Sequence, residues 1–230
     1  MTDLSDWTPP PYPPHVVRQG RYAGLEPLTR AHVGALWEAH RGEPQVWQYI
    51  PAGPFGTEAE LAAWVDRVRV LPDPQQYAVR MGDGSIGGTM SLLRINPAAG
   101  SIEVGYIVFT SRLQQTREAT EAVFLLLQWA FQAGYRRFEW KCDASNLPSR
   151  RAAERFGLSY EGVFRQATVV KGRNRDTAWF AAIDKEWPVL CQAFEAWLDP
   201  ANFDGNGRQK TSLSALTASL RAASDPALAR

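Results

Sequence analysis

The sequence predicts an α+β domain built on a twisted, mixed and mostly antiparallel sheet that is flanked by helices. Three strand patterns joined by short turns form a meander between residues 76 and 110. A long apolar helical pattern then begins at Ala119, and a lone strand pattern follows it, which indicates one parallel pairing beside the meander. With 230 residues, 45% of them hydrophobic, the chain can bury a full core.

The first half of the chain supplies two helices and four strands. The proline-rich arm at residues 1–20 cannot form a helix or a central strand, so we expect an extended segment on the surface. Thr29 is a plausible N-cap for one helix, and the capping box "TEAE" at 57–60 starts another. The predicted strands are 21–29, 76–81, 84–95 and 100–110.

The second half alternates helices and strands. The Ala119 helix is expected to stop at Gly134, because glycine commonly ends helices. The remaining predicted elements are a strand at 137–143, a helix at 149–157, two strands at 159–170 and 175–183 joined by "KGRN", and a helix at 187–198. We therefore expect a main domain at 21–199, followed by a low-complexity appendage at 200–230.

Composition and charge exclude several classes of function. The chain has 25 Lys and Arg against 24 Asp and Glu, which indicates neither direct nucleic-acid binding nor membrane association. Cys142 and Cys191 lie far apart, and the three histidines share no metal-ligand spacing, so we expect no metal site. No targeting segment is apparent, and the cysteine usage fits a reducing compartment, so the expected location is the cytoplasm.

Several segments together resemble the GNAT acetyltransferase superfamily over residues 21–198. They are "GLEPLT", "IEVGYIVF", "ATEAVFLLLQWAFQAGYRRFEWKCDASNLPSRRAAERFG" and "YEGVFR". The resemblance is to the branch that includes ribosomal-protein N-terminal acetyltransferases. It implies the GNAT fold, acetyl-CoA as co-substrate and an amine as acceptor.

The resemblance places the acyl-CoA loop at residues 114–119, immediately before the long helix. The family pattern is Q/R-x-x-G-x-G/A, and Gln114 and Ala119 match its ends, whereas Arg117 stands where the first glycine is expected. Backbone N–H groups at a helix start point outward where the helix dipole is positive, so this loop is predicted to hold a pyrophosphate. Arg117 either imposes a different turn or contacts phosphate directly, and we favour the contact.

The family's chemistry requires a base, an acid and groups that hold the cofactor. Glu103, on the strand before the loop, resembles the strand carboxylate that acts as base, and Ser149 is the candidate acid near the thiolate. The alternatives are an exposed strand glutamate and an ordinary helix cap. The residues predicted to bind the cofactor are Val108, Thr110, Gln114, Gln115, Thr116, Arg117, Glu118, Ala119, Asn146 and Arg151.

The function that follows is acetyl transfer from acetyl-CoA directly to a primary amine, which could be the N-terminal amine of a protein. Two alternatives stay open: a small-molecule amine as acceptor, and a degenerate module that binds CoA without catalysis. The basic stretch "KGRNRD" is most simply a hairpin turn, but beside an acceptor site it would favour acidic acceptors. The sequence does not decide the oligomeric state, and a dimer is one option.

Overall fold

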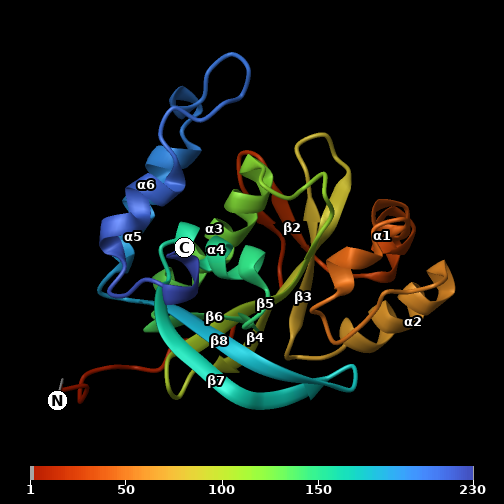
Figure 1. Cartoon of the computed structure of the whole chain (residues 1–230), viewed down its shortest axis with the longest axis horizontal. Coiled ribbons are helices and arrows are strands. Elements are labelled where there is room, and N and C mark those ends of the chain that lie inside the picture. The colour runs from red at the N-terminus through yellow and green to blue at the C-terminus, as the bar shows by residue number, and fades with distance from the viewer. Residues whose placement is uncertain (1–2, 230) are drawn as a thin grey trace.

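A computed structural model describes residues 3–229 as one eight-stranded sheet with helices on both faces (Figure 1). The strand order is β1-β2-β3-β4-β5-β6-β8-β7, and every neighbouring pair is antiparallel except β5 and β6. The strands are β1 (Arg18–Gln19), β2 (Gly24–Pro27), β3 (Gln75–Arg80), β4 (Ile86–Asn96), β5 (Ser101–Phe109), β6 (Arg137–Asp143), β7 (Ser159–Val170) and β8 (Arg173–Ile183). The predicted fold class is confirmed.

The helices form two groups that bury alternate side chains of the sheet. The α-helices are α1 (Val33–His40), α2 (Glu58–Val68), α3 (Arg117–Gln132), α4 (Leu147–Arg155), α5 (Trp187–Leu198) and α6 (Leu213–Thr217). One core joins α1 and α2 to Ala78 and Val108, and a larger core joins α3, α4 and α5 to Tyr77 and Val79. Because side chains alternate between the faces of a strand, these two groups cover opposite faces.

Most predicted elements are present, and two helix starts needed correction. The bounds predicted for β6, β7 and α5 match the structure. The long helix α3, however, begins at Arg117, where Thr116 caps it, and α4 begins at Leu147, where Asn146 caps it. Both helices therefore start two residues earlier than predicted, and the predicted cofactor loop runs into the first turn of α3.

The two ends of the chain pack against the sheet and its helices. In the arm, the Pro11 carbonyl accepts a hydrogen bond from the Tyr135 hydroxyl (3.1 Å), and the Pro13 carbonyl accepts one from Gln75 (2.7 Å). In the segment treated above as an appendage, Leu213 and Thr217 are completely buried. Asp225 forms an ion pair with Arg150 at 2.5 Å. Residues 1, 2 and 230 lie outside the described part of the chain.

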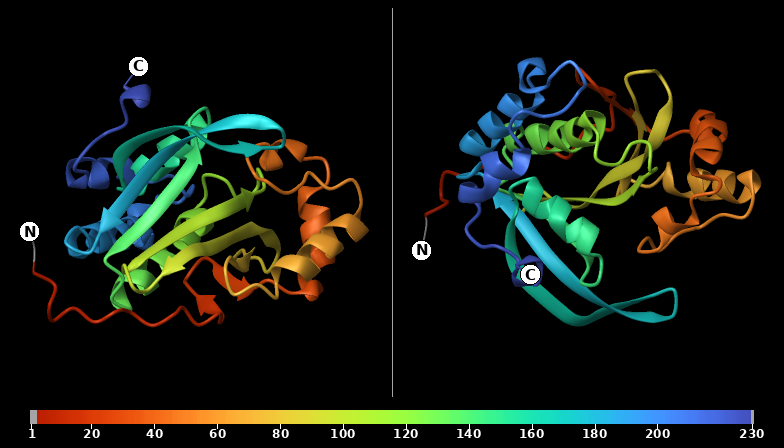
Figure 2. Two further views of the ribbon diagram at one scale, coloured as in Figure 1. Left: turned by 90° about the horizontal axis from the view of Figure 1, so that it is seen from below. Right: turned by 45° about the horizontal axis from the view of Figure 1, so that its top comes forward.

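The hairpin of β7 and β8 extends from the sheet toward the segment between α1 and α2 (Figure 2). At its tip, Lys171 Nζ donates a hydrogen bond of 3.0 Å to the Trp47 carbonyl, in the 3₁₀ turn η2 (Pro44–Trp47). This contact joins the hairpin tip to the turn that follows α1. No helix between residues 3 and 229 is long and apolar enough to cross a membrane.

Candidate active site

The sheet opens between its two parallel strands. Pairing of β5 with β6 runs from Ser101↔Arg137 to Val104↔Trp140 and ends there, although both strands continue beside their other neighbours. Just beyond this point Tyr106 has a φ of 48°, and the register between β4 and β5 shifts. The local bulge turns β5 away from β6. A cavity of about 580 Å³ lies at the opening, lined by residues of both strands.

A buried carboxylate lies at the point where the strands part. Glu103 on β5 is 2% exposed, and its Oε1 accepts a hydrogen bond of 2.7 Å from Arg94. Lys141 Nζ is 2.8 Å from the other oxygen, an ion pair without hydrogen-bond geometry. Burial raises the pKa of the Glu103 carboxyl above its ordinary value of 4.5, and the charges of Lys141 and Arg94 oppose that rise without cancelling it.

The start of α4 also lines this cavity, and α4 belongs to the helix group that contains α3 and α5. Asn146 is the N-cap, because its Oδ1 accepts a hydrogen bond from the Ser149 amide (3.1 Å). The Ser149 hydroxyl accepts a hydrogen bond of 3.0 Å from the indole N–H of Trp140. This hydroxyl therefore does not cap the helix, and its own proton is left to donate to another group. Glu103, Asn146 and Ser149 all line the cavity, as the predicted roles require.

Cys142 also lines this cavity, but its thiol is not prepared for covalent chemistry. Burial raises the thiol pKa to about 11, and the Ser149 hydroxyl opposes that rise only partly. A thiol with such a pKa stays protonated at neutral pH, so it is a poor nucleophile. The buried thiol of Cys142 is therefore a poor candidate for an acylated intermediate.

The predicted cofactor loop leads directly into α3. Thr116 caps the helix, with its hydroxyl oxygen accepting from the Ala119 amide at 3.1 Å. The Gln114 side chain donates to the Phe109 carbonyl at 2.8 Å. Within residues 3–229, the amides of Arg117 and Glu118 have no acceptor, as expected for the first turn of a helix. The loop therefore offers backbone donors for an anion.

The left-handed residue of this loop is Gln115, with a φ of 61°. Glycine is favoured in that conformation, so Gln115, and not Arg117, stands where a glycine would relieve the backbone. Arg117 is already helical, and its guanidinium lies between two rings, 4.8 Å from the centre of Tyr22 and 4.7 Å from that of Phe203. Its predicted contact with phosphate stays a prediction, but the side chain has partners within the protein.

Two of the predicted backbone donors lie on the wrong side of β5. The Thr110 amide and hydroxyl both donate to the Gly87 carbonyl, at 3.0 and 2.9 Å. Backbone groups alternate along a strand, so the Val108 amide also faces β4, where Val108 pairs with Thr89. The same alternation turns the backbone groups of Ile107 and Phe109 toward the opening. The sequence alone could not show this, because it does not give the pairing of β5 with β4.

Arg151, a predicted cofactor residue, and its neighbour Arg150 differ in accessibility. Arg151 is exposed on α4, where it can reach a ligand on the surface. Arg150 is 6% exposed, and its guanidinium is bound to Asp225 and to the Ala144 carbonyl. Of these two neighbours, only Arg151 is available to a phosphate. Within the described residues, no group of three His, Cys, Asp or Glu side chains could hold a metal ion.

A cavity where two parallel strands part, with a buried carboxylate and the start of α4 on its wall, suits acyl transfer, and the first turn of α3 offers free backbone amides. The chain belongs to the GNAT acetyltransferase family: the family profile described as "Acetyltransferase (GNAT) domain" matches residues 23–159. It is thus an acetyltransferase, and acetyl-CoA is the co-substrate that the family implies. A search of curated proteins found no match.

Solved structures agree with this assignment. A GCN5-related N-acetyltransferase from Brucella melitensis is 46% identical, with a TM-score of 0.91, covering 94% of this chain and all of that one. A probable GNAT acetyltransferase from Chromobacterium violaceum is 39% identical, with a TM-score of 0.77, covering 82% and 96%. The ribosomal L7/L12 α-N-protein acetyltransferase RimL is 21% identical, with a TM-score of 0.64, covering 76% and 99%, so it shares the fold.

Proposed function

We propose that this acetyltransferase transfers an acetyl group directly to a primary amine, with the N-terminal amine of a protein as the first candidate acceptor. Buried Glu103 at the opening between β5 and β6 carries the proposal, because its raised pKa suits a general base. Acetyl-CoA supplies a thioester: the amine nitrogen bonds to its carbonyl carbon, the C–S bond breaks, and CoA leaves as a thiolate. Glu103, directly or through water, takes the proton that the amine loses.

The remaining roles follow from where each group lies. The backbone amides at the start of α3 would bind the pyrophosphate, and the edge of β5 at Ile107 and Phe109 would bind the pantetheine. Asn146, which lines the same cavity, would contact that arm. Ser149, with its oxygen already accepting from Trp140, would donate its proton to the departing thiolate. Together, these groups suit a ligand that is long, anionic and a thioester.

A small-molecule amine is the second candidate acceptor, and one contact favours it. The hydrogen bond from Lys171 to the Trp47 carbonyl links the hairpin tip to η2 across the cavity mouth. Such a link would hinder a peptide chain more than a small amine.

Two measurements test the proposal in sequence. Acetyl-CoA at millimolar concentration should raise the melting temperature, because a ligand that binds only the native state stabilises it. Thiol release should then be measured over a panel of free amines, peptides with free N-termini and the same peptides acetylated beforehand. Amine-dependent thiol release with the acetylated product is expected. Stabilisation by CoA without turnover on any amine would instead establish a binding module.

A further inference from the structure

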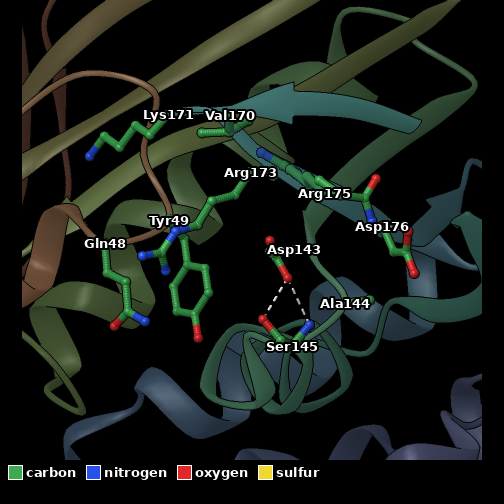
Figure 3. A pocket seen from close by; sticks show the side chains of 11 residues that line it. Gln48, Tyr49, Asp143, Ala144, Ser145, Val170, Lys171, Arg173, Arg175 and Asp176 are labelled. Atoms are coloured by element: carbon green, nitrogen blue, oxygen red, sulfur yellow. Dashed lines mark hydrogen bonds between the residues drawn. The ribbon is translucent and has the colours of Figure 1, made fainter. Parts of the chain in front are cut away.

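The β7–β8 hairpin carries three cationic side chains along the mouth of the site. Lys171, Arg173 and Arg175 line a cavity of about 560 Å³. It shares five lining residues with the larger cavity that contains Glu103: Tyr49, Asp143, Val170, Lys171 and Arg175. In Figure 3, Arg173 extends toward Gln48 and Tyr49, on the opposite wall. The two cavities are therefore adjacent, and Lys171 and Arg175 line both of them.

These cations have no acidic partner. Within residues 3–229, no carboxylate lies within 4.0 Å of the charged nitrogens of Lys171, Arg173 or Arg175. The two acids on the same wall are engaged elsewhere. Asp143 accepts from the amide and hydroxyl of Ser145, at 2.8 and 2.6 Å (Figure 3). Asp176 accepts from the Gln166 amide at 2.7 Å and from Asn174 at 3.0 Å.

Two buried donors on β8 also lack acceptors. Alternation along the strand places Arg175, Thr177 and Trp179 on one face, and all three line the larger cavity. Among the described residues, Arg175 Nε and the indole Nε1 of Trp179 are buried and find no hydrogen-bond acceptor. Buried donors in native proteins are nearly always satisfied, so two on one cavity wall indicate that a ligand supplies the acceptors.

We propose that the acceptor molecule carries, besides its amine, an oxyanion that Arg175 and Arg173 bind, with the Trp179 N–H as a further donor. The shared chemistry is that of a carboxylate or a phosphate, since guanidinium groups bind both through paired hydrogen bonds. This inference rests on the proposed amine acetylation. The oxyanion positions the acceptor between the hairpin and Glu103.

The test compares amines in matched pairs. Ethanolamine is compared with phosphoethanolamine, glycinamide with glycine, and a tetrapeptide with Asn at its second position with the same peptide carrying Asp. For at least one pair, kcat/KM of the anionic member should exceed that of the neutral member by about ten- to a hundredfold at low salt. The preferred pair identifies the source of the oxyanion. Higher salt should reduce the preference.

Variants then locate the preference. Arg175→Gln should reduce the anionic preference to within about threefold, whereas Arg175→Lys should keep part of it. Arg165→Gln is the matched control, because Arg165 is an exposed arginine of the same hairpin that lines neither cavity, and the preference should persist. Stabilisation by acetyl-CoA shows that each variant is folded.

The outcomes separate the two proposals. If neutral amines are acetylated as well as their anionic partners, or if Arg175→Gln keeps the full preference, the oxyanion inference is wrong and amine acetylation stands. If the folded protein binds acetyl-CoA but acetylates no amine in the panel, the proposed function itself fails.

Discussion

Arginines lie on both sides of the opening between β5 and β6, and the two sides use them differently. On the side of α3 and α4, Arg117 is held between Tyr22 and Phe203, and Arg150 is bound to Asp225. On the side of the β7–β8 hairpin, Arg173 and Arg175 line the cavities without any acidic partner among residues 3–229. On one side, buried Arg150 and half-buried Arg117 thus stabilise the fold, with Arg151 exposed beside them, and on the other side the unpaired hairpin arginines remain available to a ligand.

The contrast between the arginines on the two sides indicates how a cofactor loop without glycine would hold its ligand. The Gln114 and Thr116 side chains of the loop are bound to the protein, so an anion there would be held mainly by backbone N–H groups, with Arg151 as the exposed cation of α4. Backbone donors bind any pyrophosphate in the same way and give no choice among acceptors. Under the oxyanion proposal, selectivity for the acceptor comes from the hairpin, where Arg173 and Arg175 are unpaired among residues 3–229. The following predictions test this division.

The largest effect is expected when the buried ion pair of the tail is broken. Asp225→Asn leaves Arg150 buried without its counter-charge, and the free energy of unfolding should fall by about 3–5 kcal/mol. Urea unfolding measures the loss. The double variant Arg150→Met with Asp225→Leu should recover most of it, because no charge is then left buried. A loss below about 1 kcal/mol in the single variant would mean that the tail does not hold the α4 side of the site.

The second prediction concerns Glu103. Glu103→Gln should lower kcat by about 10²-fold and leave CoA affinity unchanged, because the amide cannot take a proton. Glu139→Gln is the matched control: Glu139 accepts from Arg137 at 2.6 Å and pairs with Lys141 at 2.7 Å, but it does not line the cavity. Its kcat should stay within about threefold. Equal losses in both variants would assign Glu103 to a purely structural ion cluster.

The pH profile gives an independent reading of the same residue. The base must be ionised, so kcat should fall as the pH is lowered through the Glu103 pKa, which lies above 4.5. Because the folded protein holds this proton more tightly than the unfolded chain, the contribution of Glu103 to stability decreases as the pH rises above 4.5. Activity and stability should therefore change in opposite directions across this range. An acidic limb that persists in Glu103→Gln would belong to another group.

The sequence predicts the elements of this fold better than it predicts the site. The strand "RFEWKCD" at β6 alternates buried and half-buried residues, so local pattern alone gives its bounds. The end of β5–β6 pairing depends on a bulge at Tyr106, and the partner of Arg150 is 75 residues away. Neither long-range feature has a local signature. The basic turn at 171–175 was visible in the sequence, but its position at the cavity mouth was not.

The third prediction concerns the proposed acid. Ser149→Ala removes the hydroxyl that accepts from Trp140 and should lower kcat by roughly 10- to 10²-fold, with α4 still capped by Asn146. Ser212→Ala is the control: Ser212 caps α6, so its loss should cost about 0.5–2 kcal/mol of stability without affecting turnover. If Ser149→Ala melts at a lower temperature yet turns over at the wild-type rate, the hydroxyl serves only Trp140.

The smallest effect on cofactor binding is expected for Arg117, although the sequence favours its contact with phosphate. Its guanidinium would have to leave both Tyr22 and Phe203 to reach an anion, which gives up cation–π contacts worth about 0.5–2 kcal/mol. Arg117→Ala should therefore lower the free energy of unfolding by about that amount and change the Kd for CoA by less than about threefold. Phe203→Leu, which removes one ring, should cost part of the same stability and leave CoA affinity unchanged.

Gln115→Gly provides the matched test of the loop backbone. Gln115 holds the left-handed conformation, so glycine there relieves a strain of about 1 kcal/mol and should keep or tighten CoA binding.

A tenfold or greater weakening of CoA binding in Arg117→Ala, shrinking at high salt and without loss of stability, would contradict the assignment of Arg117 to stability alone. The guanidinium would then bind the pyrophosphate, and the two sides of the site would both recognise anions through arginine side chains.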